Sequence, residues 1–254
     1  MLLAIDAGNS NVVIGCFEGE KIVKVFRMVT DSLKTEDEYA AGIKSILEFN
    51  NFDMNALSGA VISCVVPPLT KVFRGTARQL TGEEAFVIGS GIKTGLNILI
   101  DNPAELAADM VSSAVGALSS YPVPAITIDM GTATKICAID ANKSFLGGAI
   151  CPGIEISSDA LFRGAALLPR VPVEAPKKAI SSNTRECMQS GIVYGAAAMI
   201  EGMIARFEEE LGTSATVIAT GGLAPQIIPH CRVDIIHDPI LILNGLRVLY
   251  ERNR

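Results

Sequence analysis

Near its beginning the chain reads Leu2-Leu3-Ala4-Ile5-Asp6-Ala7-Gly8-Asn9-Ser10-Asn11, and close to its middle it reads Ala125-Ile126-Thr127-Ile128-Asp129-Met130-Gly131-Thr132-Ala133-Thr134. In each copy an apolar run leads into Asp-x-Gly and short polar residues, and a second apolar run and a polar turn follow. This order predicts a β-hairpin in each place. Because the copies begin almost half a chain length apart, the pattern predicts a duplicated α/β domain.

The repeat sets the expected domain organisation. We expect a first domain over residues 1–119 and a second over residues 120–254, with the boundary near Ser119-Tyr121-Pro122. The fold class predicted is α/β with mixed sheets.

Helices are expected after the sheet segments. A capping box, Thr35 with Glu38, predicts one helix with Tyr39, Ile43, Ile46 and Leu47 on a single face. A second is expected from Asn102 and Pro103 to about Leu118, a third from Asn183 to Leu211, and a last one around Leu241 to Tyr250. Gly191, Gly195 and Gly202 weaken the third helix, so close backbone packing is expected there.

Composition excludes several classes of protein. Hydrophobic residues make up 49% of 254 residues and charged residues 19%, which indicates a globular protein. The net charge of −6 and the lack of a basic run disfavour nucleic-acid binding. The six cysteines form no C-x-x-C pair, and only two histidines are present, so zinc sites and histidine triads have little support. Without a signal peptide or an apolar run of membrane length, we expect a cytoplasmic protein.

Glycine-rich turns are the candidates for chemistry. An Asp-x-Gly turn between two strands offers backbone N–H groups and short polar side chains to phosphate, and its carboxylate suits Mg²⁺. A single turn of this kind is usually an ordinary hairpin, but two opposed copies predict a clamp around one triphosphate. Gly221-Gly222, after the apolar run from Val217, would let backbone approach a flat ligand. The Gly147 to Gly153 segment is either a cleft floor or a tight loop.

These pieces in this order resemble the actin, hexokinase and Hsp70 superfamily, and their details resemble type III pantothenate kinases. The similarity runs over nearly the whole chain. It includes Asp6 to Asn11, Arg27 to Asp31, Thr35 with Asp37-Glu38-Tyr39, Ser63 to Pro67, Asp129 to Thr134, Gly147 to Gly153, Leu168-Pro169, Thr184, Gln189 to Gly191, Gly221-Gly222 and Gly245-Leu246.

The resemblance implies an actin-like (ribonuclease H-like) fold with the nucleotide in a cleft between its two halves. It implies transfer of phosphate from ATP to pantothenate, the first step toward coenzyme A, by a homodimer that needs Mg²⁺ and a monovalent cation, K⁺ or ammonium. The nucleotide residues it implies are Asp6, Gly8, Asn9, Ser10, Asn11, Gly131, Thr132, Ala133, Thr134, Gly221 and Gly222. Asp6 and Asp129 would face the metal, and Asp109 would be the catalytic carboxylate.

Departures from the family pattern gather on the acceptor side. The implied substrate residues are Ile100, Ala107, Ala108, Asp109, Met110 and Thr184, yet the family has Tyr, Gly and Arg where this chain has Ile100, Ala107 and Met110. After Thr134, Lys135 and Cys137 replace a Thr and an Asp. Either Lys135 or Arg163 stands in for the missing Arg, or the chain is a diverged paralogue. Such a paralogue would phosphorylate another hydroxyl compound, or bind nucleotide without catalysis. By spacing alone, Asp109 shares a helix face with Glu105, Ser112 and Ser113, and this face is either exposed to solvent or turned toward a cleft.

Overall fold

The computed structural model describes all residues 1–254 and shows two compact units. Unit 1 comprises residues 1–95, 102–119 and 241–254, and unit 2 comprises residues 96–101 and 120–240. The C-terminal helix α7 (Leu241–Asn253) therefore returns to unit 1, where it contacts β1, β2 and β4. The division of the chain into domains at residues 119 and 120 stays a prediction.

The sheet of unit 1 has five strands in the order β3-β2-β1-β4-β5. Their bounds are β1 (Leu2–Ala7), β2 (Asn11–Glu18), β3 (Lys21–Val29), β4 (Gly59–Cys64) and β5 (Phe86–Val87). Strand β1 pairs antiparallel with β2 and parallel with β4, so it is central and its apolar residues are buried on both faces. The first predicted hairpin is confirmed.

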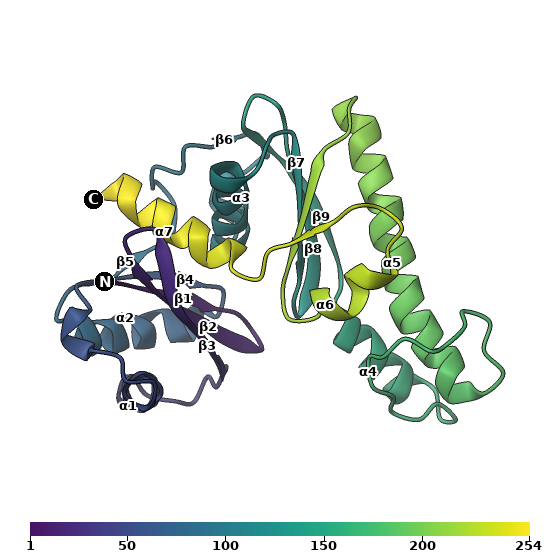
Figure 1. Cartoon of the computed structure of the whole chain (residues 1–254), viewed down its shortest axis with the longest axis horizontal. Coiled ribbons are helices and arrows are strands. Elements are labelled where there is room, and N and C mark those ends of the chain that lie inside the picture. Colours follow the sequence, from purple (N-terminus) through teal and green to yellow (C-terminus); the bar gives the residue numbers. More distant parts are fainter. The chain divides into compact units, whose positions relative to one another are not determined.

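Helices cover both faces of this sheet. Helices α1 (Glu36–Phe49) and α2 (Pro67–Thr81) lie on one side, and α7 lies on the other (Figure 1). The predicted capping box of α1 is confirmed, because Thr35 accepts from the Glu38 N–H and the Glu38 carboxylate accepts from the Thr35 N–H. Tyr39 and Phe73 bring α1 and α2 together, with ring centroids 4.7 Å apart. A short 3-10 helix, Met54–Ala56, precedes β4.

The sheet of unit 2 repeats the arrangement of unit 1. Its order is β11-β10-β7-β8-β9-β6. The bounds are β6 (Asn97–Ile98), β7 (Ala125–Met130), β8 (Ala133–Ile139), β9 (Ser144–Pro152), β10 (Thr216–Thr220) and β11 (Ile236–His237). Without β6, the pairing of β9, β8, β7, β10 and β11 matches that of β3, β2, β1, β4 and β5. The predicted α/β class with duplicated mixed sheets is confirmed.

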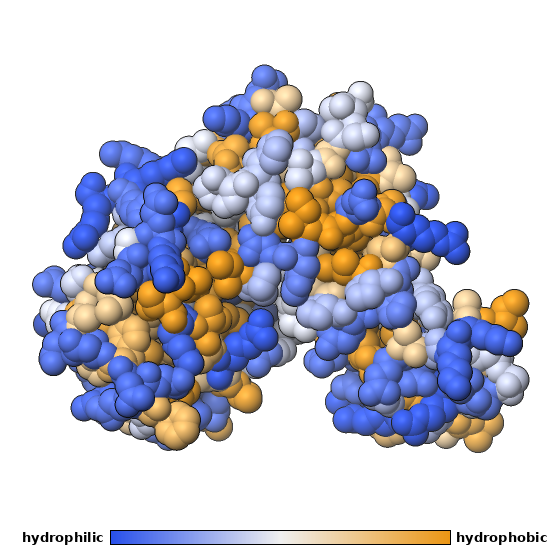
Figure 2. All heavy atoms as spheres, viewed as in Figure 1, coloured by the Kyte–Doolittle hydropathy of each residue, from blue (hydrophilic) through white to orange (hydrophobic).

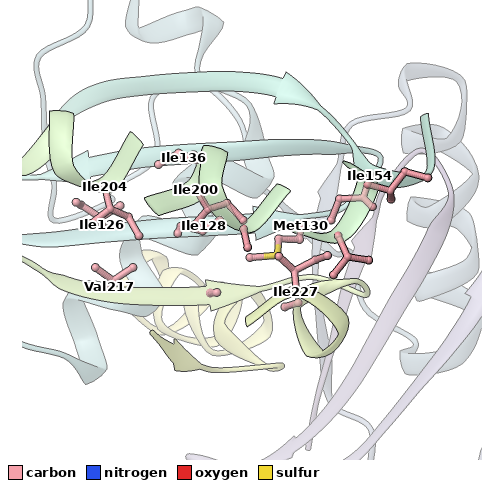
Figure 3. Close-up of a cluster of buried hydrophobic side chains, with 14 of the residues drawn as sticks. Ile126, Ile128, Met130, Ile136, Ile154, Ile200, Ile204, Val217 and Ile227 are labelled. Atoms are coloured by element: carbon pink, nitrogen blue, oxygen red, sulfur yellow. The ribbon is translucent and has the colours of Figure 1, made fainter. Parts of the chain in front are cut away.

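The core of unit 2 lies between its sheet and its helices α4 (Ile154–Gly164), α5 (Thr184–Leu211) and α6 (Ala224–Ile227). Strand residues Ile126, Ile128 and Met130 face Ile200 and Ile204 of α5 in this cluster (Figure 3). A 3-10 helix, Ile228–His230, follows α6. Burying these side chains contributes about 1.5–3 kcal/mol for each large aliphatic residue.

Helix α5 begins as predicted but its glycines behave differently. Asn183 caps it by accepting from the Glu186 N–H at 3.0 Å. The expected close packing at Gly191 and Gly195 is wrong within this chain, because a Cβ at either position would meet nothing within 4 Å. Both glycines lie on an exposed face of the helix.

The predicted helix from Pro103 to about Leu118 is two elements. Asn102 caps a 3-10 helix, Pro103–Glu105, by accepting from the Ala104 N–H and donating to the Glu105 carboxylate. Leu106 is extended, so the chain leaves the helical conformation before α3 (Ala108–Ser120) begins. Local side-chain bonds at Asn102 offer the backbone an alternative to a continuous helix.

The segment from Gly147 to Pro152 is also different from expectation, since it lies within β9 rather than in a loop. A Cβ at Gly148 would lie 2.1 Å from the Ile136 carbonyl oxygen, so the glycine allows close contact between β8 and β9.

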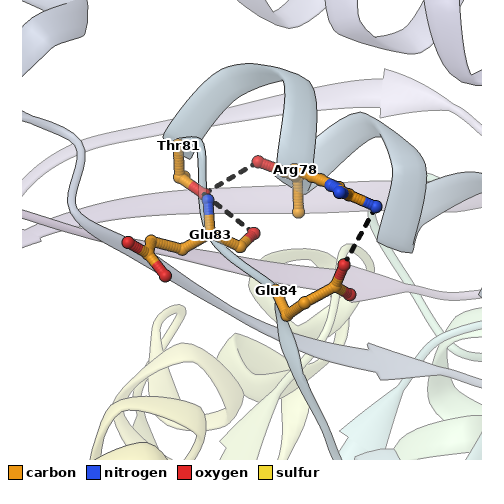
Figure 4. A network of polar contacts seen from close by, with 5 residues as sticks. Arg78, Thr81, Glu83 and Glu84 are labelled. Carbon is orange, nitrogen blue, oxygen red and sulfur yellow. Dashed lines mark hydrogen bonds and ion pairs between the residues drawn. The ribbon is translucent and has the colours of Figure 1, made fainter.

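Polar residues cover much of the visible surface of each unit, with apolar side chains between them (Figure 2). At the end of α2, Thr81 donates to the Ala77 carbonyl and accepts from the Glu83 N–H, while Arg78 pairs with Glu84 at 3.3 Å (Figure 4). Exposed pairs of this kind contribute little stability. No helix combines the length and the apolar character needed to cross a membrane.

Candidate functional site

The first Asp-x-Gly turn joins β1 to β2 in unit 1. Four residues, Gly8 to Asn11, lie between the paired residues Ala7 and Val12. The Gly8 N–H donates to the Asn11 carbonyl at 3.0 Å, and Thr30, which follows β3, holds the turn by donating its hydroxyl to the Gly8 carbonyl at 2.7 Å. Asn9, Ser10 and Asn11 are exposed, so their polar groups are accessible to a ligand.

Asp6 stands at the end of β1, immediately before this turn. Its strand neighbours are Val13 on β2 and Ser63 on β4. The Ser63 hydroxyl is buried and has no hydrogen-bond partner in the protein. A buried hydroxyl of this kind is the sort of group that a bound water or ion satisfies, and it lies beside the carboxylate proposed for the metal.

The second Asp-x-Gly turn joins β7 to β8 in unit 2 and is one residue shorter. Three residues, Gly131 to Ala133, lie between Met130 and Thr134, and the Gly131 N–H donates to the Ala133 carbonyl at 3.2 Å. Thr132 is exposed. Thr134 is buried, and its hydroxyl finds no hydrogen-bond partner in the protein.

Asp129, immediately before the second turn, forms an ion pair with Lys135. The Lys135 Nζ lies 2.7 Å from the Asp129 Oδ2, and the two side chains are 17% and 14% exposed. Lys135 departs from the family pattern, and its pairing with Asp129 was not predicted from the sequence. The signal was present, because residues equally far from the ends of a tight hairpin turn lie opposite one another and project from the same face.

Two glycines pack the backbone of unit 2 against the second turn. Gly221 has φ +97° and lies so close to Met130 that a Cβ would be 2.6 Å from its backbone atoms. A Cβ on Gly153, which precedes α4, would lie 2.0 Å from the Thr132 carbonyl oxygen. The structure therefore brings Gly221 and the start of α4 to the turn that contains Thr132. Gly221 was predicted from the sequence as a nucleotide-binding residue. The close contact of Gly153 with Thr132 was not predicted.

Asp109 lies in the first turn of α3 in unit 1. It is 8% exposed, and its Oδ1 accepts from the Met110 N–H at 2.7 Å. Ser112 and Ser113 are buried with it, whereas Glu105 belongs to the separate 3-10 helix. The face that bears Asp109 is thus not a solvated one. Ala107, Ala108 and Met110 surround it in the sequence and are half-buried.

The remaining predicted substrate residues belong to unit 2. Ile100 follows β6, and its Cγ2 lies 3.7 Å from the position of a Cβ at Gly147. Thr184 is exposed at the first position of α5. Of the two cations considered as replacements for the missing Arg, Lys135 is paired with Asp129 and Arg163 lies 3.9 Å from Asp159.

No group of three or more His, Cys, Asp or Glu side chains gathers into a ready-made metal site. The buried Cys16 thiol has a pKa raised to about 12, because burial disfavours its thiolate, so it is unsuited to nucleophilic chemistry. The chemistry that this arrangement supports is the binding of phosphate groups by backbone N–H and hydroxyl donors, with carboxylates beside them.

Two sheets of one topology, each with a polar turn after its central strand, define an actin-like ATPase fold. Solved structures of this class are similar to the chain. They include (R)-2-hydroxyglutaryl-CoA dehydratase component A of Acidaminococcus fermentans, with a TM-score of 0.57 and 14% identity over 98% of this chain and 96% of that one. A ROK hexokinase from Thermus thermophilus gives a TM-score of 0.51 and 13% identity, covering 98% and 97% of the two chains. At these identities the similarity establishes the fold alone.

The chain belongs to the type III pantothenate kinase family, whose model matches residues 2–206. A type III pantothenate kinase of Moorella thermoacetica is 44% identical over 253 residues, which cover 100% of both chains. One from Bacillus cytotoxicus is also 44% identical, covering 100% of this chain and 97% of the relative.

Proposed function

We propose that this protein transfers a phosphate group from ATP to pantothenate, forming phosphopantothenate in the first step of coenzyme A biosynthesis. The observation that carries the proposal is full-length similarity to type III pantothenate kinases, joined to a polar Asp-x-Gly turn at the same place in both sheets.

The two turns are proposed to bind the phosphates of one nucleotide. Asn9 and Ser10 of the first turn, Thr132 of the second turn and Thr134 just after it would donate hydrogen bonds to phosphate oxygens. The backbone of Gly8, Asn11, Gly131 and Ala133 would shape the two turns around these oxygens. Gly221 and Gly222 would admit the flat part of the nucleotide close to the backbone. The unpartnered Thr134 hydroxyl and the exposed Asn9, Ser10 and Thr132 support this assignment.

The residues present fit Mg²⁺. This ion retains several waters and is usually held by one or two carboxylates together with substrate phosphates, so it needs no preformed cluster of ligands. Asp6 is the proposed carboxylate, with the unpartnered Ser63 hydroxyl beside it, and Asp129 is proposed to face the metal from unit 2. When bound, Mg²⁺ would neutralise charge on the transferring phosphate.

Asp109 is proposed to align the acceptor hydroxyl and accept its proton. Phosphoryl transfer needs mainly positioning and charge neutralisation, so one carboxylate suffices on the acceptor side. Its burial and the fixed hydrogen bond from the Met110 N–H give Asp109 a defined orientation. Ile100, Ala107, Ala108, Met110 and Thr184 are the other proposed acceptor residues.

A second candidate function is favoured by the residues around Asp109. Met110 has neither the charge nor the donors of the Arg that this position has in the family, and an Arg is well suited to hold a carboxylate such as that of pantothenate. Under this alternative, the chain binds nucleotide but phosphorylates another hydroxyl compound, or acts without catalysis as a regulator.

We also propose a homodimer that includes the exposed face of α5, with Thr184 reaching the acceptor of the partner subunit. Nothing within the chain covers Gly191 or Gly195, so a second copy could approach the helix backbone closely there. Sedimentation equilibrium at micromolar protein concentration should give a dimer, and a monomer would contradict this part of the proposal.

A coupled assay of ADP release, together with phosphorus NMR of the product, tests the proposed function. We expect turnover that needs ATP, Mg²⁺ and pantothenate. Turnover only with another alcohol would favour the diverged kinase, and nucleotide binding without turnover of any acceptor would favour the regulator.

A further inference from the structure

The ion pair between Lys135 and Asp129 is set by the second hairpin itself. The two residues lie directly opposite one another where β7 pairs antiparallel with β8. Side chains of such a pair leave the sheet on the same face. The register of the hairpin therefore places the Lys135 ammonium 2.7 Å from the Asp129 carboxylate.

The pair is short and largely withdrawn from water. A charge-assisted hydrogen bond of this length is stronger than a neutral one. With side chains 17% and 14% exposed, neither group can recover full hydration by separating from the other. The Asp129 carboxylate consequently has a fixed, singly charged cation as its partner beside the second turn.

The family resemblance implies a monovalent cation, K⁺ or ammonium. The ion pair leaves little room for such a cation beside Asp129. A K⁺ ion that approached the Asp129 Oδ2 from the side of Lys135 would compete with the Lys135 ammonium for this oxygen, and the positive charge of the ammonium would repel it. Cys137, buried on the same face of β8, offers a thiol rather than an oxygen beside Lys135. Hard cations prefer carboxylate, carbonyl and water oxygens to sulfur. The residues present do not fit a K⁺ or ammonium site.

We infer that the Lys135 ammonium replaces the monovalent cation of the family at the second turn, so that this chain binds and uses ATP without K⁺ or ammonium. An alkylammonium carries the same single positive charge as K⁺ and, unlike it, is tethered to the protein. This inference rests on the proposed kinase function for its activity readout, but not for its nucleotide-binding readout.

The test compares the natural protein with three variants in choline, potassium and ammonium chloride at equal ionic strength. The natural protein should show the same pantothenate kinase activity, and the same affinity for a non-hydrolysable ATP analogue with Mg²⁺, in all three salts. In choline, Lys135→Thr should lose about 10- to 100-fold in nucleotide affinity, the usual scale for a bond to a charged group. Potassium or ammonium should restore most of it.

Lys135→Met sharpens the result, because its apolar side chain removes the charge but fills the space. It should show the same loss with no recovery in potassium. Lys177→Thr, at an exposed lysine of the same unit, is the matched control and should keep the behaviour of the natural protein in every salt.

The outcomes separate the two claims. A natural protein whose nucleotide affinity rises several-fold on exchange of choline for potassium overturns the inference, whether or not pantothenate is phosphorylated. Salt-independent nucleotide binding without pantothenate turnover, with the expected behaviour of Lys135→Thr, upholds the inference and overturns the proposed function. Absence of nucleotide binding in every salt overturns both.

Discussion

The two Asp-x-Gly turns share a sequence pattern and a place in the fold, but the residues beside their carboxylates differ. Asp6 is flanked by Val13 on one neighbouring strand and Ser63 on the other. Asp129 is flanked in the corresponding positions by Lys135 and Thr220. Val13 offers no charge, whereas Lys135 forms an ion pair with Asp129.

From this difference we infer that the proposed neutralisation of nucleotide charge is divided between the two turns. A carboxylate beside valine and serine suits a divalent ion that arrives with the nucleotide. A carboxylate already paired with an ammonium is a less effective ligand for a second cation, because its charge is already partly neutralised. We therefore propose Asp6 as the main carboxylate for Mg²⁺.

The largest effect should separate the two carboxylates directly. Asp6→Asn removes the charge proposed to face Mg²⁺, so we expect kcat to fall by about 10³-fold or more and nucleotide affinity to lose its dependence on Mg²⁺. Calorimetric titration with and without Mg²⁺ measures this. Asp234→Asn, at an exposed carboxylate of unit 2, is the control. A mutant with full magnesium dependence would show that Asp6 does not face the metal.

The next effect concerns the acceptor rather than the nucleotide. Asp109→Asn should leave ATP binding intact while kcat falls by ~10²–10⁴-fold, because only the group that aligns the acceptor hydroxyl is lost. Steady-state kinetics and nucleotide titration on one protein sample distinguish the two. Phosphorylation of pantothenate at the natural rate would leave Asp109 with a structural role only.

A gain is expected from Met110→Arg, which supplies the family's residue at the acceptor site. A regained partner for a carboxylate is worth ~1.5–3 kcal/mol, so the KM for pantothenate should fall by about tenfold to a hundredfold. Met110→Lys, which adds charge without the planar fork, should give a smaller gain. If neither variant improves pantothenate use, another alcohol becomes the favoured acceptor.

The packing of the second turn predicts an effect on stability. Gly221→Ala places a Cβ against the Met130 backbone at a positive φ, so we expect a loss of about 1–3 kcal/mol. Thermal unfolding should show a lower Tm and weaker nucleotide binding. Gly164→Ala, at a residue of α4 where a Cβ meets nothing within 4 Å, should lower neither.

The smallest effect compares the far ends of the two hairpins. Gly19 turns the first hairpin with φ +58°, whereas Asp140 holds the second by accepting from the Ser144 N–H at 2.7 Å and the Asn142 N–H at 2.8 Å. The hydrogen bond from the Ser144 N–H lowers the pKa of Asp140 most, and the hydrogen bond from the Asn142 N–H lowers it further.

A lowered pKa in the folded protein stabilises it at pH values above the ordinary carboxyl pKa, and this contribution is lost as the pH falls through the lowered value. Urea unfolding should therefore separate Asp140→Ala from the natural protein more at pH 7 than at pH 3. An equal difference at both values would contradict the role of the charge.

Sequence patterns predicted the fold well because neighbouring residues specify each copy of the repeat. Each hairpin is specified by alternating strand residues and an Asp-x-Gly turn, and the caps at Thr35 and Asn183 needed only neighbouring residues. Patterns failed where tertiary contacts decide. The return of α7 to unit 1 depends on contacts with β1, β2 and β4 that local periodicity does not contain. The break at the extended Leu106, which separates the 3-10 helix from α3, was also not predicted.

The candidate site was predictable in its parts but not in its pairings. The carboxylates and glycines stood out as residue types in a pattern. The closeness of Gly153 and Gly221 to the second turn depends on packing of segments far apart in the sequence. The Lys135–Asp129 pair could have been predicted from the strand register of the hairpin. The family pattern has another residue at position 135, so Lys135 was interpreted as the loss of that residue and not as a partner of Asp129.

A crystal structure with Mg²⁺ and a non-hydrolysable ATP analogue, grown in potassium salt, would decide between a shared and a single phosphate site. We expect phosphates in contact with both the Asn9–Ser10 and the Thr132 turns, Mg²⁺ beside Asp6, and the Lys135 ammonium still on Asp129 with no potassium there. Phosphates held by one turn only, or potassium at the Asp129 carboxylate with Lys135 displaced, would contradict this expectation.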